Sequence, residues 1–125
     1  IAAEVYGLGI LAREIEDRAD NATRFLVLGR KLLRSSGADR TTLLLSIGET
    51  RSPGALHRLL EPLARYRISM TRIESRPSHR RKWDYVFFID IEGHAEDAGV
   101  RKALAALKKR ASLFRVLGSY PRALL

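Results

Sequence analysis

The sequence from Thr41 onward switches repeatedly between two hydrophobic periods, and the order of the switches restricts the possible folds. A strand places alternate residues on one face, whereas a helix returns to the same face about every 3.6 residues. The expected segments are a strand over 41–47, a helix from Ser52, strands over 68–75 and 83–91, a helix over 96–110, and a strand over 112–117. The apolar face of the first helix consists of Leu56, Leu59, Leu60, Leu63 and Tyr66.

This order of strand, helix, strand, strand, helix and strand is the ferredoxin-like βαββαβ plan of the α+β class. In that plan two helices cover one face of an antiparallel sheet. Ser52 and Pro53 are typical N-cap and first-turn residues for the first helix. Glu96 and Asp97 place negative charge at the start of the second helix, where it complements the helix dipole. We therefore expect one domain over residues 41–125.

The residues before Thr41 have a different pattern. Apolar side chains recur at helical spacing over residues 2–18, and residues 23–28 form a short apolar run that predicts a strand. Residues 30–40 show neither period and are expected to form a linker. The sequence begins without an initiator methionine, so we expect residues 1–29 to be a helix and strand that end another domain of a longer polypeptide.

The composition excludes several classes of protein. The 125 residues include no cysteine, so neither a disulfide framework nor a thiolate metal site is possible. No apolar run approaches the roughly 20 residues that span a bilayer. The three histidines, His57, His79 and His94, lack the spacing of metal ligands. We expect a cytoplasmic protein without a metal or another cofactor.

The formal net charge of +9 makes a nucleic acid a candidate partner. The basic residues lie mostly after residue 40, with a dense cluster over residues 79–82. RNA-recognition modules of the same strand order carry stacking aromatics on the strand that here contains Tyr85, Phe87 and Phe88. The strand over 41–47 has no aromatic residue to complete such a platform. A basic RNA-binding module therefore remains an alternative to an ordinary solvated basic surface.

Gly54, Ala55 and Leu56 follow Pro53 at the predicted start of a helix. A helix N-terminus presents backbone N–H groups without intrahelical partners and a partial positive charge, and both attract a carboxylate. Glycine has no Cβ, which allows a ligand to approach the backbone. The pattern is equally typical of an ordinary capped helix start.

Glu74, Ser75, Arg76 and Pro77 follow the apolar residues of the predicted strand over 68–75. An acid, a hydroxyl and a guanidinium together offer partners for both an ammonium group and a carboxylate. A surface strand that ends at a turn proline has the same composition. With the helix start at Gly54, this phrase predicts a site for a small zwitterion such as an amino acid.

A third phrase, Thr23, Arg24 and Phe25, begins the short run before the linker. A threonine hydroxyl there is able to donate a hydrogen bond to a reacting oxygen, and the arginine suits an anionic substrate. An exposed edge residue beside a solvated arginine is the simpler interpretation.

In their order along the chain, residues 23–25, 54–56 and 74–77 resemble the C-terminal part of the prephenate dehydratase family. The bifunctional chorismate mutase/prephenate dehydratase members of that family are most similar. In that family a threonine-arginine-phenylalanine motif lies near the end of the dehydratase domain, and an ACT regulatory domain follows. The glycine-alanine-leucine and glutamate-serine-arginine-proline motifs of that ACT domain match residues 54–56 and 74–77. His57 departs from the family, which often has valine there.

The resemblance implies an enzyme that converts prephenate to phenylpyruvate in L-phenylalanine biosynthesis. Thr23 would be the catalytic hydroxyl, with Arg24 near the substrate carboxylates and Phe25 in support. L-Phenylalanine would bind residues 54–56 and 74–77 of a homodimer or larger homo-oligomer and inhibit by feedback, without a nucleic acid or membrane partner. An ACT domain that senses another amino acid is a second alternative. The fragment alone is expected to be inactive as a dehydratase.

Overall fold

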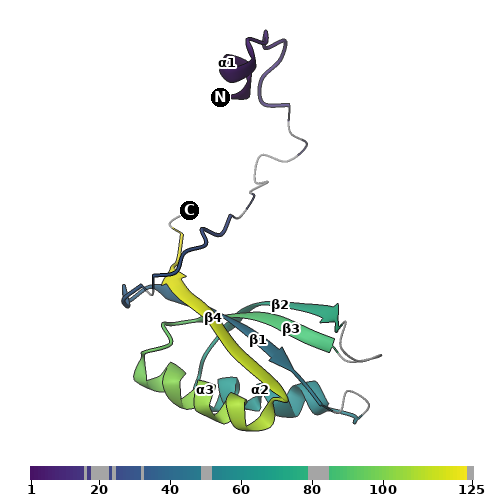
Figure 1. Ribbon diagram of the computed structural model, residues 1–125, viewed down its shortest axis with the longest axis vertical. Coiled ribbons are helices and arrows are strands. Elements are labelled where there is room, and N and C mark those ends of the chain that lie inside the picture. The colour runs from purple at the N-terminus through teal and green to yellow at the C-terminus, as the bar shows by residue number, and fades with distance from the viewer. Residues whose placement is uncertain are drawn as a thin grey trace.

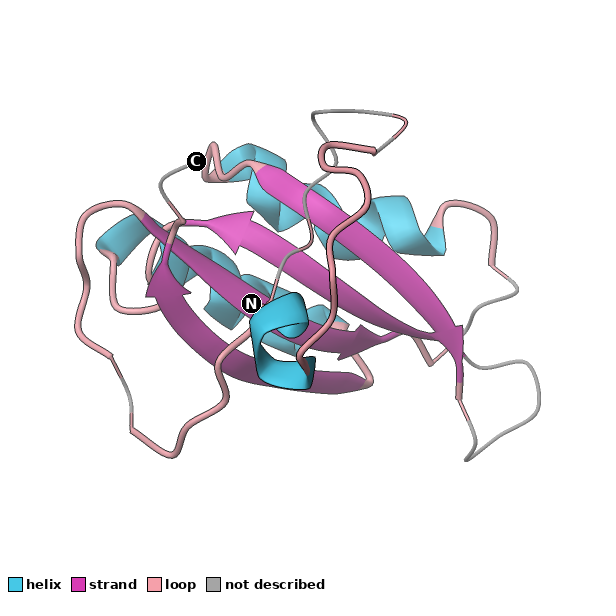
Figure 2. Cartoon of the chain, turned by 90° about the horizontal axis from the view of Figure 1, so that it is seen from above, coloured by secondary structure: helices cyan, strands magenta, loops and turns pink. Residues whose placement is uncertain are grey.

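The computed structural model describes residues 1–15, 17, 23, 25–31, 33–48, 52–78 and 85–123. From residue 39 onward the elements follow the expected βαββαβ order and form a four-stranded antiparallel sheet in the order β2-β3-β1-β4. Both long helices cover the same face of this sheet, and the opposite face is open (Figures 1 and 2). The elements are α1 (Ala2–Tyr6), β1 (Asp39–Ser46), α2 (Ala55–Arg65), β2 (Met70–Pro77), β3 (Tyr85–Glu92), α3 (Ala98–Arg110) and β4 (Leu113–Pro121).

The hydrophobic core lies between the sheet and the two helices. Alternate residues of the central strands β1 and β3 point toward the helices, because successive side chains of a strand lie on opposite faces. The helices contribute apolar side chains at helical spacing, and each fully buried side chain of this size stabilises the fold by about 1.5–3 kcal/mol. The buried apolar residues are Leu43, Leu45, Leu59, Leu63, Phe87, Ile89, Ile91, Val100, Ala103, Leu104 and Leu107.

Several boundaries differ from the sequence-based expectation. β1 begins at Asp39, inside the range expected to be a linker. β2 continues through Pro77, so the phrase over residues 74–77 lies within a strand that pairs with β3. β4 continues past Gly118 to Pro121, and its register with β1 shifts between Thr42 and Leu43. Cross-strand pairing extends these strands beyond the runs that apolar alternation alone marks.

The expectation of a helix over 2–18 is wrong. The helix α1 covers only Ala2–Tyr6, and Gly7 ends it in the left-handed conformation (φ 62°). Residues 23 and 25–28, where a strand was expected, form no strand, and Arg24 lies outside the described residues. Isolated helices shorter than about 12–15 residues are marginal, and the apolar side chains here, such as Leu11, are exposed instead of packed.

Within the described part of the chain, no helix is long and apolar enough to cross a membrane.

Candidate functional site

The two phrases that predict a zwitterion site lie at the same end of the sheet. Arg76 of β2 pairs with Val86 of β3, Val86 with Ser46 of β1, and Ser46 with Leu113 of β4. This row marks the end of the sheet where β1 and β2 finish. The chain leaves β1 at this end and enters α2 through Gly54, so topology brings both phrases to one end of the domain.

The start of α2 is a tight turn closed by Pro53 and Gly54. The Ala55 N–H donates to the Ser52 carbonyl (3.1 Å), and Gly54 has φ 72° and ψ 12°. These angles are those of the third residue in a type II turn, which favours proline before it and glycine at that position. Ser52 was expected to be the N-cap, and this is wrong, because the turn makes Gly54 the cap residue and no side chain caps the helix.

Arg58 folds back over this turn. Its Nη1 donates to the Pro53 carbonyl and its Nη2 to the Ser52 hydroxyl, both at 2.8 Å. A Cβ on Gly54 would lie 3.3 Å from Arg58 Nη1, so the glycine leaves the space that the guanidinium uses. The positive charge of Arg58 therefore adds to that of the helix N-terminus.

Two backbone N–H groups at the helix start are available to a ligand. The first residues of a helix have no carbonyl four residues back within the helix. Arg58 N–H donates to the Gly54 carbonyl (2.9 Å), but within the described chain the N–H groups of Leu56 and His57 have no acceptor. Two free donors beside a guanidinium form an arrangement that suits a carboxylate.

Arg110, at the end of α3, stabilises the same region through the backbone of α2. Pro62 lacks an N–H group, so the Arg58 carbonyl, four residues earlier, has no donor from the helix. Arg110 Nη1 donates to this carbonyl (2.5 Å) and also contacts Glu61 Oε2 (2.8 Å). Desolvation alone would raise the pKa of Glu61, but the Arg110 hydrogen bond and the charges of Arg65 and Arg110 lower it.

A cavity of about 720 Å³ adjoins the helix start, between α2 and the end of α3. Its volume is within the roughly 300–1,000 Å³ that small-molecule pockets occupy. Ile47, Ala55 and Leu59 form apolar parts of its wall, and Arg58 and Arg110 are among its polar residues. The cavity therefore combines an apolar surface with positive charge.

The second phrase, on β2, divides between the two faces of the sheet. Ser75 pairs with the core residue Phe87, so its side chain is on the helix side, and its neighbours Glu74 and Arg76 point to the open side. Glu74 forms ion pairs with both Arg76 (2.7 Å) and Arg72. The hydrogen bond and charge of Arg76, followed by the charge of Arg72, lower the pKa of the Glu74 carboxyl.

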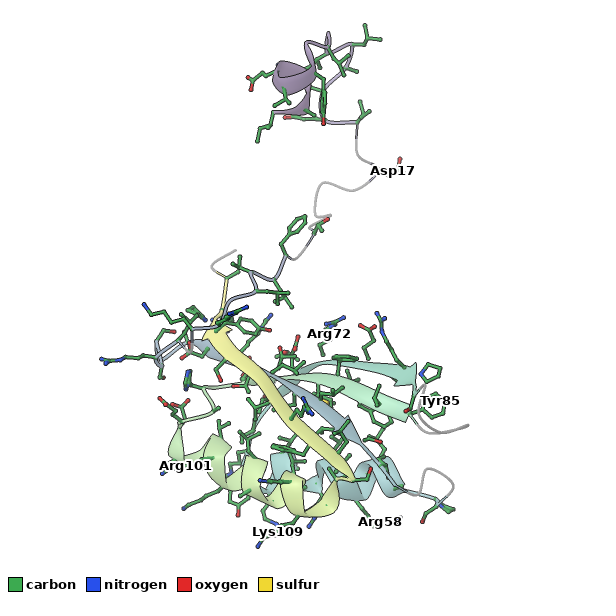
Figure 3. The ribbon with its side chains drawn as sticks, viewed as in Figure 1. Asp17, Arg58, Arg72, Tyr85, Arg101 and Lys109 are labelled. Carbon is green, nitrogen blue, oxygen red and sulfur yellow. The ribbon has the colours of Figure 1, made fainter. Side chains whose placement is uncertain are left out.

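One copy of the chain does not combine the two phrases into a single site. One strand, β3, separates β2 from β1, the strand that leads into α2. Arg72 lies on the open side of the sheet, whereas Arg58 lies by the helices (Figure 3). Among the described residues, no hydrogen bond or ion pair joins residues 54–56 to residues 74–77.

In the third phrase the structure describes Thr23 and Phe25, and no hydrogen bond or ion pair joins either of these two residues to residues 54–56 or 74–77. Thr23 is exposed, and the Phe25 side chain is 84% exposed.

The alternative of a basic RNA-binding module requires exposed aromatic residues on β3, and one of the three candidates is not exposed. Phe87 is buried against the helices, so it is not available to stack on a base. The cluster over 79–82 lies outside the described residues.

Family models account for most of the chain. Residues 41–109 match the model described as ACT domain, and residues 1–32 match the model described as Prephenate dehydratase. The chain belongs to the ACT domain family. The ACT match covers α2, β2 and β3 and most of β1 and α3.

Relatives of this ACT chain combine the same two regions in longer proteins. The bifunctional chorismate mutase/prephenate dehydratase of Aquifex aeolicus is 50% identical over 125 residues, which is 100% of this chain and 34% of the relative. The protein of the same description from Neisseria gonorrhoeae is 50% identical over 99% of this chain and 34% of its own length. The chain therefore spans about a third of the length of these curated relatives.

A solved structure supports the architecture of the ACT domain. The prephenate dehydratase from Arthrobacter aurescens, determined in complex with L-Phe, is 41% identical with a TM-score of 0.68. The match covers 74% of this chain and 30% of that one.

Sequence reasoning missed the roles of Arg58 and Arg110. Arg58 lies on the helix face opposite the apolar stripe, a position that favours a solvated side chain. Its contacts depend on the turn at Gly54, which the pattern did not reveal. The proline inside α2 was the available signal for Arg110, because it guarantees a carbonyl without a helical donor.

Proposed function

We propose that this chain is the regulatory part of a cytoplasmic prephenate dehydratase and binds L-phenylalanine for feedback inhibition. The reaction that it controls is the conversion of prephenate to phenylpyruvate in L-phenylalanine biosynthesis. The observation that carries the proposal is the helix start, where the N–H groups of Leu56 and His57 have no acceptor in the described chain and Arg58 supplies positive charge. The relative that was solved with L-Phe supports the choice of ligand.

The helix start and its cavity match the two ends of L-phenylalanine. The free N–H groups and Arg58 bind the carboxylate by charge-assisted hydrogen bonds. The apolar wall around Leu59 buries the ring, and full burial of such a side chain contributes about 1.5–3 kcal/mol. His57, which is exposed at the cavity, adjusts affinity more than the class of ligand.

Among the described residues, Glu61 is the acid that lines the cavity, and it is already paired with Arg65 and Arg110, so the ammonium group requires a further acid. We infer that the phrase from Glu74 to Pro77 comes from the edge of a second copy. β2 is an edge strand, and two of its apolar side chains, Met70 and Ile73, are 40% and 42% exposed. Exposed apolar residues along an unpaired strand edge favour association with a partner.

The dimer is tested by the substitution Ile73→Lys, examined by sedimentation velocity. A lysine would place charge in the proposed interface, so we expect the variant to be monomeric under conditions where the parent chain is dimeric. A parent chain that is monomeric with saturating L-phenylalanine would contradict this assembly.

The role of Thr23, Arg24 and Phe25 in catalysis remains a proposal. Thr23 and Phe25 are exposed, so a catalytic role requires a site completed by other parts of the enzyme. We therefore expect the 125-residue chain to leave prephenate unchanged. Turnover by the isolated chain would show that these residues need no further partners.

Calorimetric titration with L-phenylalanine, L-tyrosine and single-stranded RNA tests the proposal. We expect heat of binding with L-phenylalanine and weaker or no heat with L-tyrosine. If the chain binds another amino acid more tightly than L-phenylalanine, the chain is an amino-acid sensor with a different ligand. Heat with RNA and none with any amino acid would replace the proposal by the RNA-binding alternative.

A further inference from the structure

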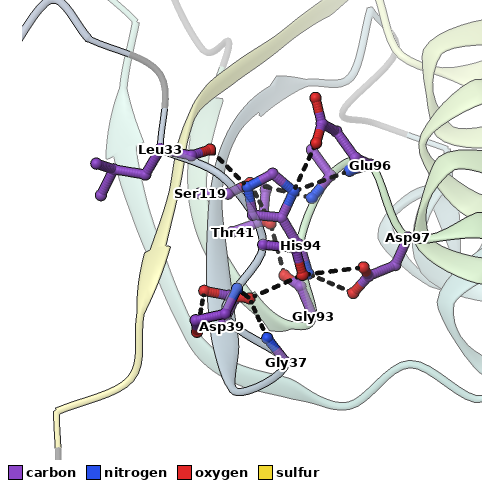
Figure 4. Close-up of polar contacts among 12 residues, drawn as sticks. Leu33, Gly37, Asp39, Thr41, Gly93, His94, Glu96, Asp97 and Ser119 are labelled. Atoms are coloured by element: carbon purple, nitrogen blue, oxygen red, sulfur yellow. Dashed lines mark hydrogen bonds and ion pairs between the residues drawn. The ribbon is translucent and has the colours of Figure 1, made fainter.

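A second polar cluster lies at the opposite end of the sheet from the start of α2, where β1 begins and β3 and β4 end. It connects residues 33–38 to the ACT domain (Figure 4). These residues lie between the two family matches. We call residues 33–38 the junction.

The carboxylate of Asp39 is the first anchor of the junction. It accepts hydrogen bonds from the Ser36 N–H (2.8 Å), the Ser36 hydroxyl (2.7 Å), the Gly37 N–H (3.2 Å) and the Ser35 hydroxyl (3.2 Å). Asp39 itself is 5% exposed and is the first residue of β1. Burial alone would raise its pKa, but the hydrogen bonds from Ser36, Ser35 and Gly37 lower it.

The ring of His94 is the second anchor. Its Nδ1 lies 3.1 Å from the Glu96 N–H and must accept that hydrogen, because a backbone amide is only a donor. With Nδ1 as the acceptor, Nε2 carries the ring hydrogen and donates it to the Leu33 carbonyl (3.0 Å). The His94 side chain is buried, with the residue 4% exposed, so loss of this acceptor would leave a buried donor unsatisfied.

Asp97 fixes the backbone that carries this ring. Its Oδ2 accepts the His94 N–H (2.8 Å), its own N–H donates to the His94 carbonyl (3.0 Å), and its Oδ1 lies 3.4 Å from the Ser35 hydroxyl. The junction thus contacts the loop before α3 as well as the start of β1.

The two central strands connect the junction directly to the proposed ligand end. β1 runs from Asp39 toward the turn at Gly54, and β3 runs from the ligand end to Glu92, two residues before His94. Each strand has eight residues, or about 25 Å at roughly 3.3 Å per residue. Because β1 is paired with both β3 and β4 along its length, a displacement of this strand at the ligand end would also act at the junction.

We propose that His94 is a positioning residue that fastens the junction to the ACT domain, and that ligand binding at the start of α2 alters this attachment. The junction is then a fixed arm that sets the direction in which the preceding residues leave the domain. The effect of the ligand rests on the proposed function, whereas the attachment itself does not.

Hydrogen exchange of the Ser36 and Gly37 amides, followed by NMR, tests the attachment in the 125-residue chain. The substitution His94→Phe removes the donor to Leu33 and retains a ring, so we expect exchange of both amides to rise about fivefold, within the range for loss of one hydrogen bond. His94→Gln offers an amide N–H in place of Nε2 and should restore protection. Glu96→Gln is the matched control. Its backbone N–H remains, and the carboxylate that it replaces is 3.9 Å from His94 Nδ1 on a side chain that is 78% exposed, so exchange should be unchanged.

The same amides report the coupling to the ligand end. Saturating L-phenylalanine should change their exchange in the parent chain and not in the His94→Phe variant, whose titration heat should remain. The proposed attachment would be overturned if exchange in His94→Phe were unchanged. It would also be overturned if exchange in His94→Gln rose as much as in His94→Phe. Binding heat in the parent chain without any change at Ser36 and Gly37 would overturn the coupling.

Absence of heat with L-phenylalanine would instead contradict the proposed function. The attachment would still be decided by the exchange of the unliganded variants.

Discussion

Replacement of Gly54 by alanine tests the argument about the start of α2 most simply. Gly54 has a φ of 72°, in the left-handed region that costs an L-residue about 1–2 kcal/mol. Part of this cost is offset, because alanine loses less conformational entropy than glycine on folding, by about 0.4–1 kcal/mol. We therefore expect Gly54→Ala to lower the free energy of unfolding by about 1 kcal/mol.

The added methyl group also acts on the ligand site. Its Cβ would lie 3.3 Å from Arg58 Nη1, closer than an ordinary contact, so the guanidinium must move. A charge-assisted hydrogen bond contributes about 1.5–3 kcal/mol, and its partial loss should weaken L-phenylalanine binding by up to about tenfold. Urea unfolding measures the first effect, and calorimetry measures the second.

Gly99→Ala is the matched control. Gly99 lies in α3 without a positive φ, and no atom lies within 4 Å of the Cβ position. We expect this substitution to stabilise the domain by about 0.4–1 kcal/mol and to leave L-phenylalanine affinity unchanged. If Gly54→Ala stabilises the domain as Gly99→Ala does, our reasoning about the backbone of this turn is wrong.

Three further substitutions test separate parts of the account. Arg58→Gln should lower L-phenylalanine affinity about 10- to 100-fold in calorimetry, because a neutral amide replaces a charged donor, and undiminished affinity would remove Arg58 from the site. Glu74→Gln should weaken binding of L-phenylalanine and leave the thermal midpoint unchanged, since its ion pairs are solvent-exposed; a large fall in the midpoint would instead assign it a structural role. The pKa of the Asp39 carboxyl is lower in the folded chain than its ordinary value of 3.8. The stabilisation that this carboxylate contributes is therefore complete above pH 3.8 and is lost as the pH falls through the folded pKa. The thermal midpoints of the parent chain and Asp39→Asn should therefore differ most above about pH 5 and converge as the pH falls below the folded pKa, and a difference that stays constant as the pH falls would contradict the sign.

The sequence was sufficient to predict the architecture of the ACT domain, because two periods of hydrophobicity are hard to confuse over long segments. The face of α2 that contains Leu59 and Leu63 is buried as expected, and so is the face of β3 that contains Ile89. The strand limits were less predictable. β2 continues through Glu74 to Pro77 because cross-strand pairing with β3, and not its own apolar pattern, sustains it.

The residues before the ACT domain show the limit of periodicity. The apolar spacing around Leu8 and Leu11 is helical, yet the helix ends at Tyr6. An amphipathic stripe favours a helix only when it has a surface to bury against, and these side chains are exposed. A pattern in sequence identifies a face but not its partner.

Polar networks were the feature that was hardest to predict from the sequence. Asp90 is buried in β3, where Thr42 donates to its carboxylate (2.7 Å), and Tyr120 from β4 contacts the same threonine hydroxyl (2.9 Å). These residues are far apart in sequence and meet only through strand pairing. The contact between His94 and Leu33 likewise depends on the path of the chain before β1, which no local motif encodes.

Binding of the L-phenylalanine carboxylate at the start of α2 can be observed residue by residue in an NMR titration of the ¹⁵N-labelled chain. We predict that L-phenylalanine shifts the amide signals of Leu56 and His57 and the side-chain signal of Arg58 in proportion to occupancy. β-Phenethylamine, which has the ring and the ammonium group but no carboxylate, should leave these signals in place. Shifts confined to other parts of the domain, or equal shifts with both compounds, would contradict the account.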